Sequence, residues 1–106
     1  MQSKGFLDLM HTKLYPIALE IQKIQANNLG AKYRGATGNI TLEEWFELIR
    51  KYKYVCLCCH QQEPNIILTI DHVIPISKGG PNVINNIQPL CGPCNYKKGR
   101  KSTDYR

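Results

Sequence analysis

Four of the five cysteines fall into two pairs, each with a two-residue gap. The pairs are Cys56–Cys59 and Cys91–Cys94, with 31 residues between them. Such a gap lets both sulfurs of a pair reach one tetrahedral Zn²⁺, whereas disulfide frameworks spread their cysteines along the chain. A redox CxxC is the alternative, but it leaves the other pair unexplained. We therefore expect a structural zinc site, with Cys58 as a bystander or a ligand in a shifted register.

A second group of residues between and just after the cysteine pairs could perform hydrolysis. Asp71 offers a hard oxygen ligand beside His72, whose imidazole suits a general base near neutral pH. Asn86 and Asn95 carry carboxamides that can coordinate a cation or fix the backbone without titrating. An Asp-His pair taken alone is equally a structural hydrogen-bonding pair. Its position between the cysteine pairs favours a catalytic role over a purely structural one.

Basic side chains gather near the C-terminus of a chain with a net charge of +6. The last ten residues hold five Lys and Arg against one Asp, an electrostatic pattern typical of proteins that bind polyanions. A solvated surface is the alternative. The candidate phosphate contacts are Lys78, Lys97, Lys98, Arg100 and Lys101.

The elements that must position these groups form an α+β pattern. Residues 66–70 are β-branched and apolar, which predicts a buried strand running into Asp71 and His72. Breakers from Pro75 to Asn82 predict a loop. Residues 86–90 are expected to return as a strand, and a short helix should begin near Cys94. Asp71 and His72 can face one centre only if the strand ends or twists there.

The N-terminal part is predicted to be helical. Thr41 and Glu44 form a capping box before a helix that buries Trp45 and ends near Tyr54. Residues 6–28 have helical periodicity, interrupted at Pro16 and stopped at residues 27–30. We expect residues 1–40 to form a helical arm and a basic connector (residues 30–40) that serve packing or mobility rather than catalysis. Residues 41–106 are expected to form the functional domain.

Length and composition exclude several classes of protein. The chain of 106 residues fits one small domain with a thin core, which structural zinc would supplement. No apolar run reaches the ~18 residues that a membrane span needs. The first residues do not resemble a secretory signal, so we expect a cytoplasmic protein that does not contact membranes.

The arrangement of these motifs closely resembles the zinc-containing HNH endonucleases. The resemblance covers about residues 41–100 and rests on the two cysteine pairs, residues 71–75, Gly79-Gly80, residues 86–90 and residues 95–99. Residues 34–38 with Thr41, Glu44 and Trp45 also resemble the segment that often precedes this motif. One departure is His60, because glycine often follows the first cysteine pair in the family.

The resemblance implies a ββα-metal, treble-clef-like fold that the four-cysteine zinc site stabilises. It also implies that the protein hydrolyses phosphodiester bonds of double-stranded DNA. The same resemblance implies that His72 is the base and that Asp71 and Asn95 hold one catalytic Mg²⁺ or Mn²⁺. It also implies that Asn86 holds the loop and orients His72 through backbone hydrogen bonds. Asparagine at position 95, where others carry histidine, favours a hard cation; other divalent cations also fit. A bacterial or phage setting fits the pattern. The alternative function is a zinc-stabilised nucleic-acid-binding module without catalytic activity.

Overall fold

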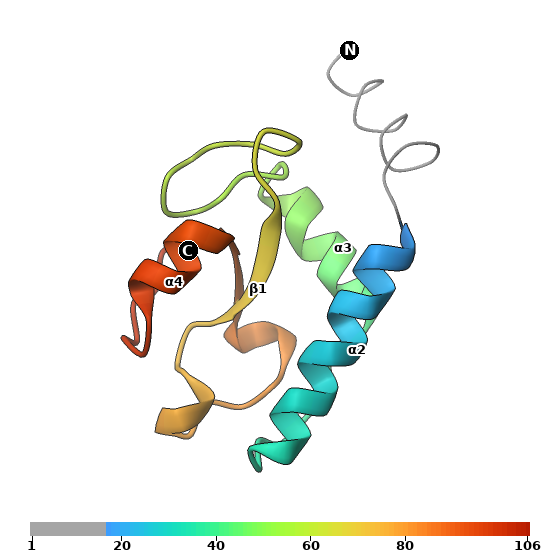
Figure 1. Ribbon diagram of the computed structural model, residues 1–106, viewed down its shortest axis with the longest axis vertical. Helices are drawn as coiled ribbons and strands as arrows, with labels where there is room; N and C mark the ends of the chain where they lie inside the picture. Colours follow the sequence, from blue (N-terminus) through green and yellow to red (C-terminus); the bar gives the residue numbers. More distant parts are fainter. Residues whose placement is uncertain (1–16) are drawn as a thin grey trace.

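A computed structural model describes residues 17–106 of the chain and shows a small α+β fold (Figure 1). The apolar positions expected in a first helical piece before Pro16 lie outside these residues. In Figure 1, α4 lies on one side of β1, and α2 and α3 lie on the other. The helices and strands are α2 (Ile17–Tyr33), α3 (Leu42–Lys51), β1 (Leu68–His72), β2 (Ile87–Cys91) and α4 (Gly92–Lys98). This is the expected α+β class.

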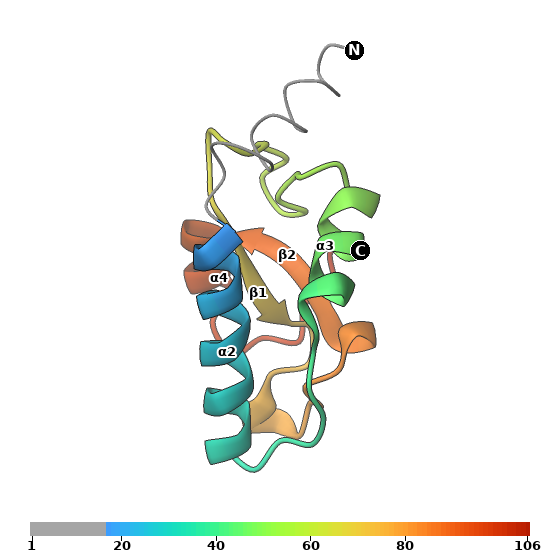
Figure 2. The same cartoon turned by 90° about the vertical axis from the view of Figure 1, so that its right-hand side faces the viewer.

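The two strands form an antiparallel hairpin that α4 follows directly (Figure 2). Leu68 pairs with Cys91 at one end and His72 pairs with Ile87 at the other. The first strand therefore begins and ends two residues later than the sequence pattern predicts. β2 passes into α4 after Cys91, so residues 66 and 67 have no strand to pair with, and Ile67 is 69% exposed.

Helix α3 confirms the predicted capping box. Thr41 Oγ1 accepts a hydrogen bond from the Glu44 backbone N–H at 3.0 Å, and Glu44 Oε1 accepts from the Thr41 N–H at 2.9 Å. Trp45 is fully buried, as its apolar helical spacing predicts. The helix ends at Lys51 rather than near Tyr54, because the backbone of Lys53 and Tyr54 takes positive φ angles that no α-helix accommodates.

Helix α2 corrects the predicted stop at residues 27–30. The helix continues through Gly30 to Tyr33, and its end is set by Gly35, which has a φ of 79°. The Ala36 N–H donates to the Ala31 carbonyl and the Gly35 N–H to the Lys32 carbonyl, a pattern that closes helices with a left-handed residue. Residues 30–33, expected in the connector, are thus the last turn of the helix.

The core joins α2 to the rest of the fold. Ile24 packs in a buried cluster with Trp45, Leu68 and Leu90. Glu20 is buried and accepts a hydrogen bond at 2.8 Å from the indole N–H of Trp45. These contacts fix α2 against α3 and the hairpin. Within residues 17–106, no helix is both long and apolar enough to cross a membrane.

Candidate active site and metal centre

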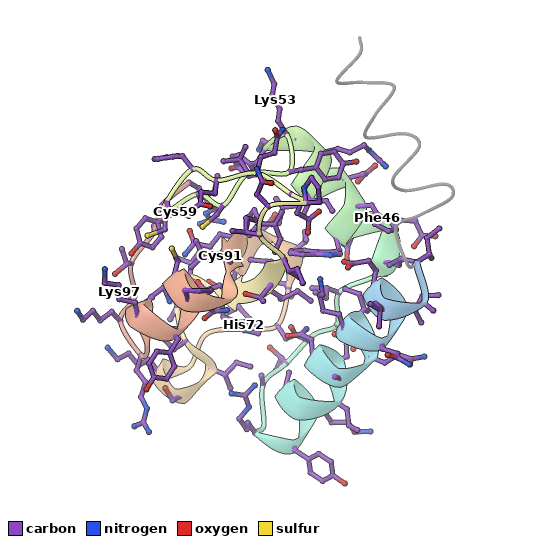
Figure 3. All side chains as sticks on the ribbon, turned by 45° about the horizontal axis from the view of Figure 1, so that its top comes forward. Phe46, Lys53, Cys59, His72, Cys91 and Lys97 are labelled. Atoms are coloured by element: carbon purple, nitrogen blue, oxygen red, sulfur yellow. The ribbon has the colours of Figure 1, made fainter. Side chains whose placement is uncertain are left out.

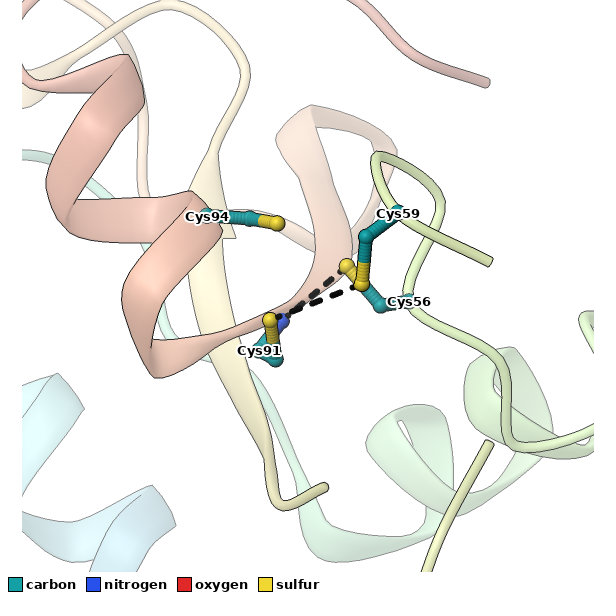
Figure 4. A group of neighbouring side chains, drawn as sticks. All are labelled: Cys56, Cys59, Cys91 and Cys94. Atoms are coloured by element: carbon teal, nitrogen blue, oxygen red, sulfur yellow. Dashed lines mark hydrogen bonds between the residues drawn. The ribbon is translucent and has the colours of Figure 1, made fainter. Parts of the chain in front are cut away.

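The four paired cysteines converge at the start of α4 (Figure 4). Cys56 and Cys59 come from the loop after α3, whereas Cys91 ends β2 and Cys94 lies in the first turn of α4. Their four sulfur atoms all lie within 4.8 Å of one another. Four thiolates around one point are the donor set of a closed, tetrahedral structural zinc site. The cluster is therefore positioned to bind a metal ion such as zinc.

Backbone groups around the cluster favour a thiolate at Cys56. Burial acts to raise its pKa, but N–H donors of the neighbouring cysteines outweigh that effect and lower the pKa of Cys56 to about 7. One of them, the Cys91 N–H, donates to Cys56 Sγ at 3.3 Å. Burial raises the pKa values of Cys91 and Cys94. A divalent cation would stabilise the charged form of all four sulfurs.

The sequence leaves open the roles of two residues beside the cluster. Cys58 is half-buried and is not one of the four clustered sulfurs. His60 is exposed and has a φ of 66°. This left-handed conformation is the one that glycine adopts at low cost. His60 therefore takes a glycine-like backbone conformation at the position where the resemblance leads us to expect glycine.

A polar pocket of about 530 Å³ lies at the other end of the hairpin. Asp71, His72 and Asn95 all line it, so the structure brings these three predicted site residues together. Asp71 and His72 are the last two residues of β1, as their predicted shared centre requires. In Figure 3, His72 lies between α4 and α2, whereas Lys97 extends outward from α4. The polar lining also includes Asn27, Arg34, Ser77 and Arg100.

The Asp71 carboxylate is almost completely buried and held by two neighbours. Lys98 Nζ lies 3.2 Å from Asp71 Oδ2, and Gln88 Nε2 donates to the same oxygen at 2.9 Å. The Lys98 ammonium also donates to the His72 carbonyl at 3.1 Å. The side chain of Lys98 is 0% exposed. This corrects the expectation that Lys98 lies on a phosphate-facing surface, because its ammonium group is buried and pairs with the Asp71 carboxylate.

The His72 imidazole is held by the loop between the strands. Its Nε2 atom lies 2.9 Å from Asn82 Oδ1. Burial lowers the pKa of His72 below its usual value; the hydrogen bond to Asn82 and the charge of Asp71 oppose this shift, and the charges of Arg34 and Lys98 add to it. The ring is therefore neutral at pH 7 and able to accept a proton.

Asn86 lies outside the pocket lining and holds the loop whose residues 75–77 form part of that lining. Its side chain accepts a hydrogen bond from the Ile74 N–H at 3.0 Å and donates to the carbonyls of Ile74 and Pro81. Gly80 permits this packing, because a Cβ atom there would lie 1.8 Å from the Ile74 carbonyl oxygen. These contacts are compatible with the loop-holding role that the resemblance implies for Asn86.

The Asn95 carboxamide has a defined orientation. The Thr69 hydroxyl donates its one proton to the Leu90 carbonyl at 2.6 Å, so it can only accept from Asn95 Nδ2, 2.9 Å away. The oxygen of Asn95 is left for another partner. Together with the carboxylate of Asp71 it offers the hard oxygen donors that Mg²⁺ and Mn²⁺ prefer, so the residues present fit such a cation.

The other four predicted basic residues are exposed: Lys78, Lys97, Arg100 and Lys101. Arg100 also lines the pocket. Sequence reasoning did not assign Asn27, Arg34 or Asn82 to the site. The only signal for Arg34 was its place in the segment resembling the region before the motif. Nothing local marks the two asparagines, because tertiary packing alone brings them to His72.

Comparison with known proteins gives one family assignment. Residues 56–101 match the family described as HNH endonuclease. Searches of curated proteins and of solved structures gave no match. The matched segment begins at the first cysteine of the cluster and contains all of β1, β2 and α4. Residues 56–101 are therefore similar to the HNH endonuclease family, and the four cysteines near the two ends of this segment are positioned to bind a metal ion.

Proposed function

We propose that this chain is a metal-dependent endonuclease that hydrolyses phosphodiester bonds of double-stranded DNA, with His72 as the general base. The observation that carries the proposal is the polar pocket lined by His72, Asp71 and Asn95 together. A neutral imidazole beside a carboxylate and a carboxamide is a suitable set for hydrolysing a phosphodiester, and pure binding does not require it. The similarity of residues 56–101 to the HNH endonuclease family implies a nucleic-acid substrate.

In the proposed mechanism, the His72 imidazole accepts a proton from the attacking water through its unprotonated ring nitrogen. Asp71 and Asn95 would hold a divalent cation, which when bound would supply positive charge to stabilise the phosphate and the leaving 3′-oxygen. Lys98 and Gln88 fix the Asp71 carboxylate through Oδ2. Arg34 and Arg100, which line the pocket, would pair with the phosphate being cleaved.

Exposed basic residues provide the contacts to flanking phosphates. Lys78 lies on the loop between the strands, Lys97 lies on α4, and Lys101 follows that helix. Contacts of this kind bind the DNA backbone without reading its sequence. We infer that residues 41–106 form the nuclease domain, and that zinc at the cysteine cluster is structural.

Cleavage of plasmid DNA by the zinc-loaded protein with Mg²⁺ or Mn²⁺ tests the proposal. His72→Ala should lower the cleavage rate by about 10²–10⁴-fold, the usual contribution of a positioned general base. It should keep zinc, fold and DNA affinity. His60→Ala is the matched control, because His60 is exposed and does not line the pocket; it should cut at the wild-type rate.

The pH dependence gives a second readout. The wild-type rate should fall as the pH drops through the pKa of His72, which burial places below its usual value of 6.5, and it should be constant near neutral pH. Binding of DNA without cleavage under all metal conditions would instead support the alternative, a nucleic-acid-binding module. Wild-type cleavage by His72→Ala with an unchanged pH profile would overturn the mechanism.

A further inference from the structure

A chain of hydrogen bonds connects the His72 imidazole to α2 and the connector, both outside the segment that matches the HNH family. The chain begins at the backbone of Ile40. The Ile40 N–H donates to Asn28 Oδ1 at 3.1 Å, and the Ile40 carbonyl accepts from Asn28 Nδ2 at 2.9 Å. A backbone N–H can only donate and a carbonyl can only accept. The carboxamide of Asn28 therefore has a single orientation.

The orientation of Asn28 determines that of Asn82, which is 0% exposed. Asn28 Oδ1 lies 2.9 Å from the Asn82 carboxamide and can only accept, so it must face Asn82 Nδ2. The carbonyl end of Asn82 then faces His72. The contact of Asn27 agrees with this orientation, because its Nδ2 donates to the same Asn82 Oδ1 at 3.0 Å. A carbonyl oxygen has two lone pairs and can accept from both neighbours.

The protonation of the His72 ring follows from the same logic. Asn82 Oδ1 lies 2.9 Å from His72 Nε2 and has no proton to give. Nε2 must therefore carry the hydrogen, and in the neutral ring Nδ1 must carry the lone pair. We propose that Asn82, oriented by Asn28, is a positioning residue that fixes His72 in its Nε2–H tautomer and so presents Nδ1 as the base.

This assignment gives α2 and the connector a part in the chemistry, whereas the sequence favoured packing or mobility over catalysis for this region. The Asn82 loop is held against the connector at further points: the Asn82 N–H donates to the Thr37 carbonyl at 2.7 Å. Gly38 has a φ of 95°, and a Cβ atom there would lie 2.6 Å from the Asn82 carbonyl oxygen. The catalytic consequence rests on the proposed function, but the tautomer does not.

Nuclear magnetic resonance of ¹⁵N-histidine-labelled, zinc-loaded protein at pH 8 tests the tautomer without any cleavage. Wild-type His72, assigned by the loss of its signals in His72→Ala, should show a proton on Nε2 that is protected from solvent exchange and an unprotonated Nδ1. Asn82→Ala and Asn28→Ala should lose that protection and give a mixture of tautomers. Asn85→Ala is the control, since Asn85 is exposed on the same loop, and it should leave the ring signals unchanged.

Cleavage kinetics then test the consequence. Misplacing a catalytic group by about 1 Å can cost about 10²-fold, so Asn82→Ala should lower kcat by that order with little change in KM. A proton on Nδ1 in the wild type would overturn the proposal even if no variant folds. Unchanged ring signals in a folded Asn82→Ala protein would also overturn it. If the wild type proved inactive, the proposed function would fail while the ring signals still decided the tautomer.

Discussion

The four-cysteine cluster and the His72 pocket lie at opposite ends of one hairpin. Cys91 pairs with Leu68 at one end and His72 pairs with Ile87 at the other, a separation of about 13 Å along the strand. At the cluster, four identical donors converge on one point. At the pocket, a carboxylate, an imidazole and a carboxamide line about 530 Å³ of space together with two arginines.

This difference gives the two ends different tasks: the cluster stabilises the fold, and the pocket is suited to chemistry. A four-thiolate site has no open position for water or substrate, so a metal there can only stabilise the fold. The pocket leaves room for a phosphate and has mixed donors with distinct tasks. The two sites still share one element, because Cys94 and Asn95 are adjacent on α4. Predictions that disable one end of the hairpin should therefore have different signatures from those that disable the other.

The largest expected effect is at the cluster. Cys91→Ser, or removal of zinc with a chelator, should unfold the protein, because metal binding at such a site contributes folding free energy that a thin core does not replace. Circular dichroism and metal analysis measure both losses. Cys58→Ser is the control and should keep its zinc and its melting temperature. A chelated protein that stays folded would contradict the structural role of the metal.

The next effect is at the buried ion pair of the pocket. Lys98→Met should lower the free energy of unfolding by about 3 kcal/mol, because it leaves the Asp71 carboxylate buried without its cationic partner. Urea denaturation of zinc-loaded protein measures the change. Lys97→Met removes the same charge from an exposed neighbour on the same helix, and it should be nearly neutral. Equal effects of the two substitutions would show that the ion pair contributes nothing.

A smaller effect concerns the basic surface around the pocket. Each Lys97→Gln, Arg100→Gln or Lys101→Gln substitution should reduce the slope of log affinity against log salt by about 0.9 for duplex DNA. The loss should be the same for all DNA sequences. Lys51→Gln and Lys53→Gln are controls from the exposed end of α3 and the turn after it. An unchanged slope in the Lys97, Arg100 and Lys101 variants would identify the cluster as a solvated surface.

The smallest effect returns to the cysteine end. His60→Gly should raise the free energy of unfolding by about 1 kcal/mol, because glycine adopts the observed φ of 66° without steric cost. Gln61→Gly is the matched control at the next exposed position; it should lower stability, since it only adds freedom to the unfolded chain. A loss of stability in both variants would show that the His60 side chain itself stabilises the turn.

The same two ends differ in how far the sequence predicts them. The cysteine pairs, the capping box of Thr41 and Glu44, and the Asp71–His72 pair are visible because their members are close in the chain. The burial of Lys98 and the contact of Asn28 with Asn82 are not visible, since those asparagines are 54 positions apart in the sequence and only packing brings them together. The predicted strand is displaced by two residues because the start of β1 depends on where β2 ends and α4 begins.

The loop between the strands has one further consequence, which concerns tolerance to insertion. Its second half is fixed by Asn86 and by the close approach of Gly80 to Ile74, whereas residues 77–79 are exposed and a Cβ atom at Gly79 would meet nothing within 4 Å. Chain-closure entropy grows slowly with loop length, by about 0.6 kcal/mol for each doubling. Extra residues at this tip would therefore reshape the rim of the pocket beside Ser77 while the hairpin register and the cysteine cluster stay as they are.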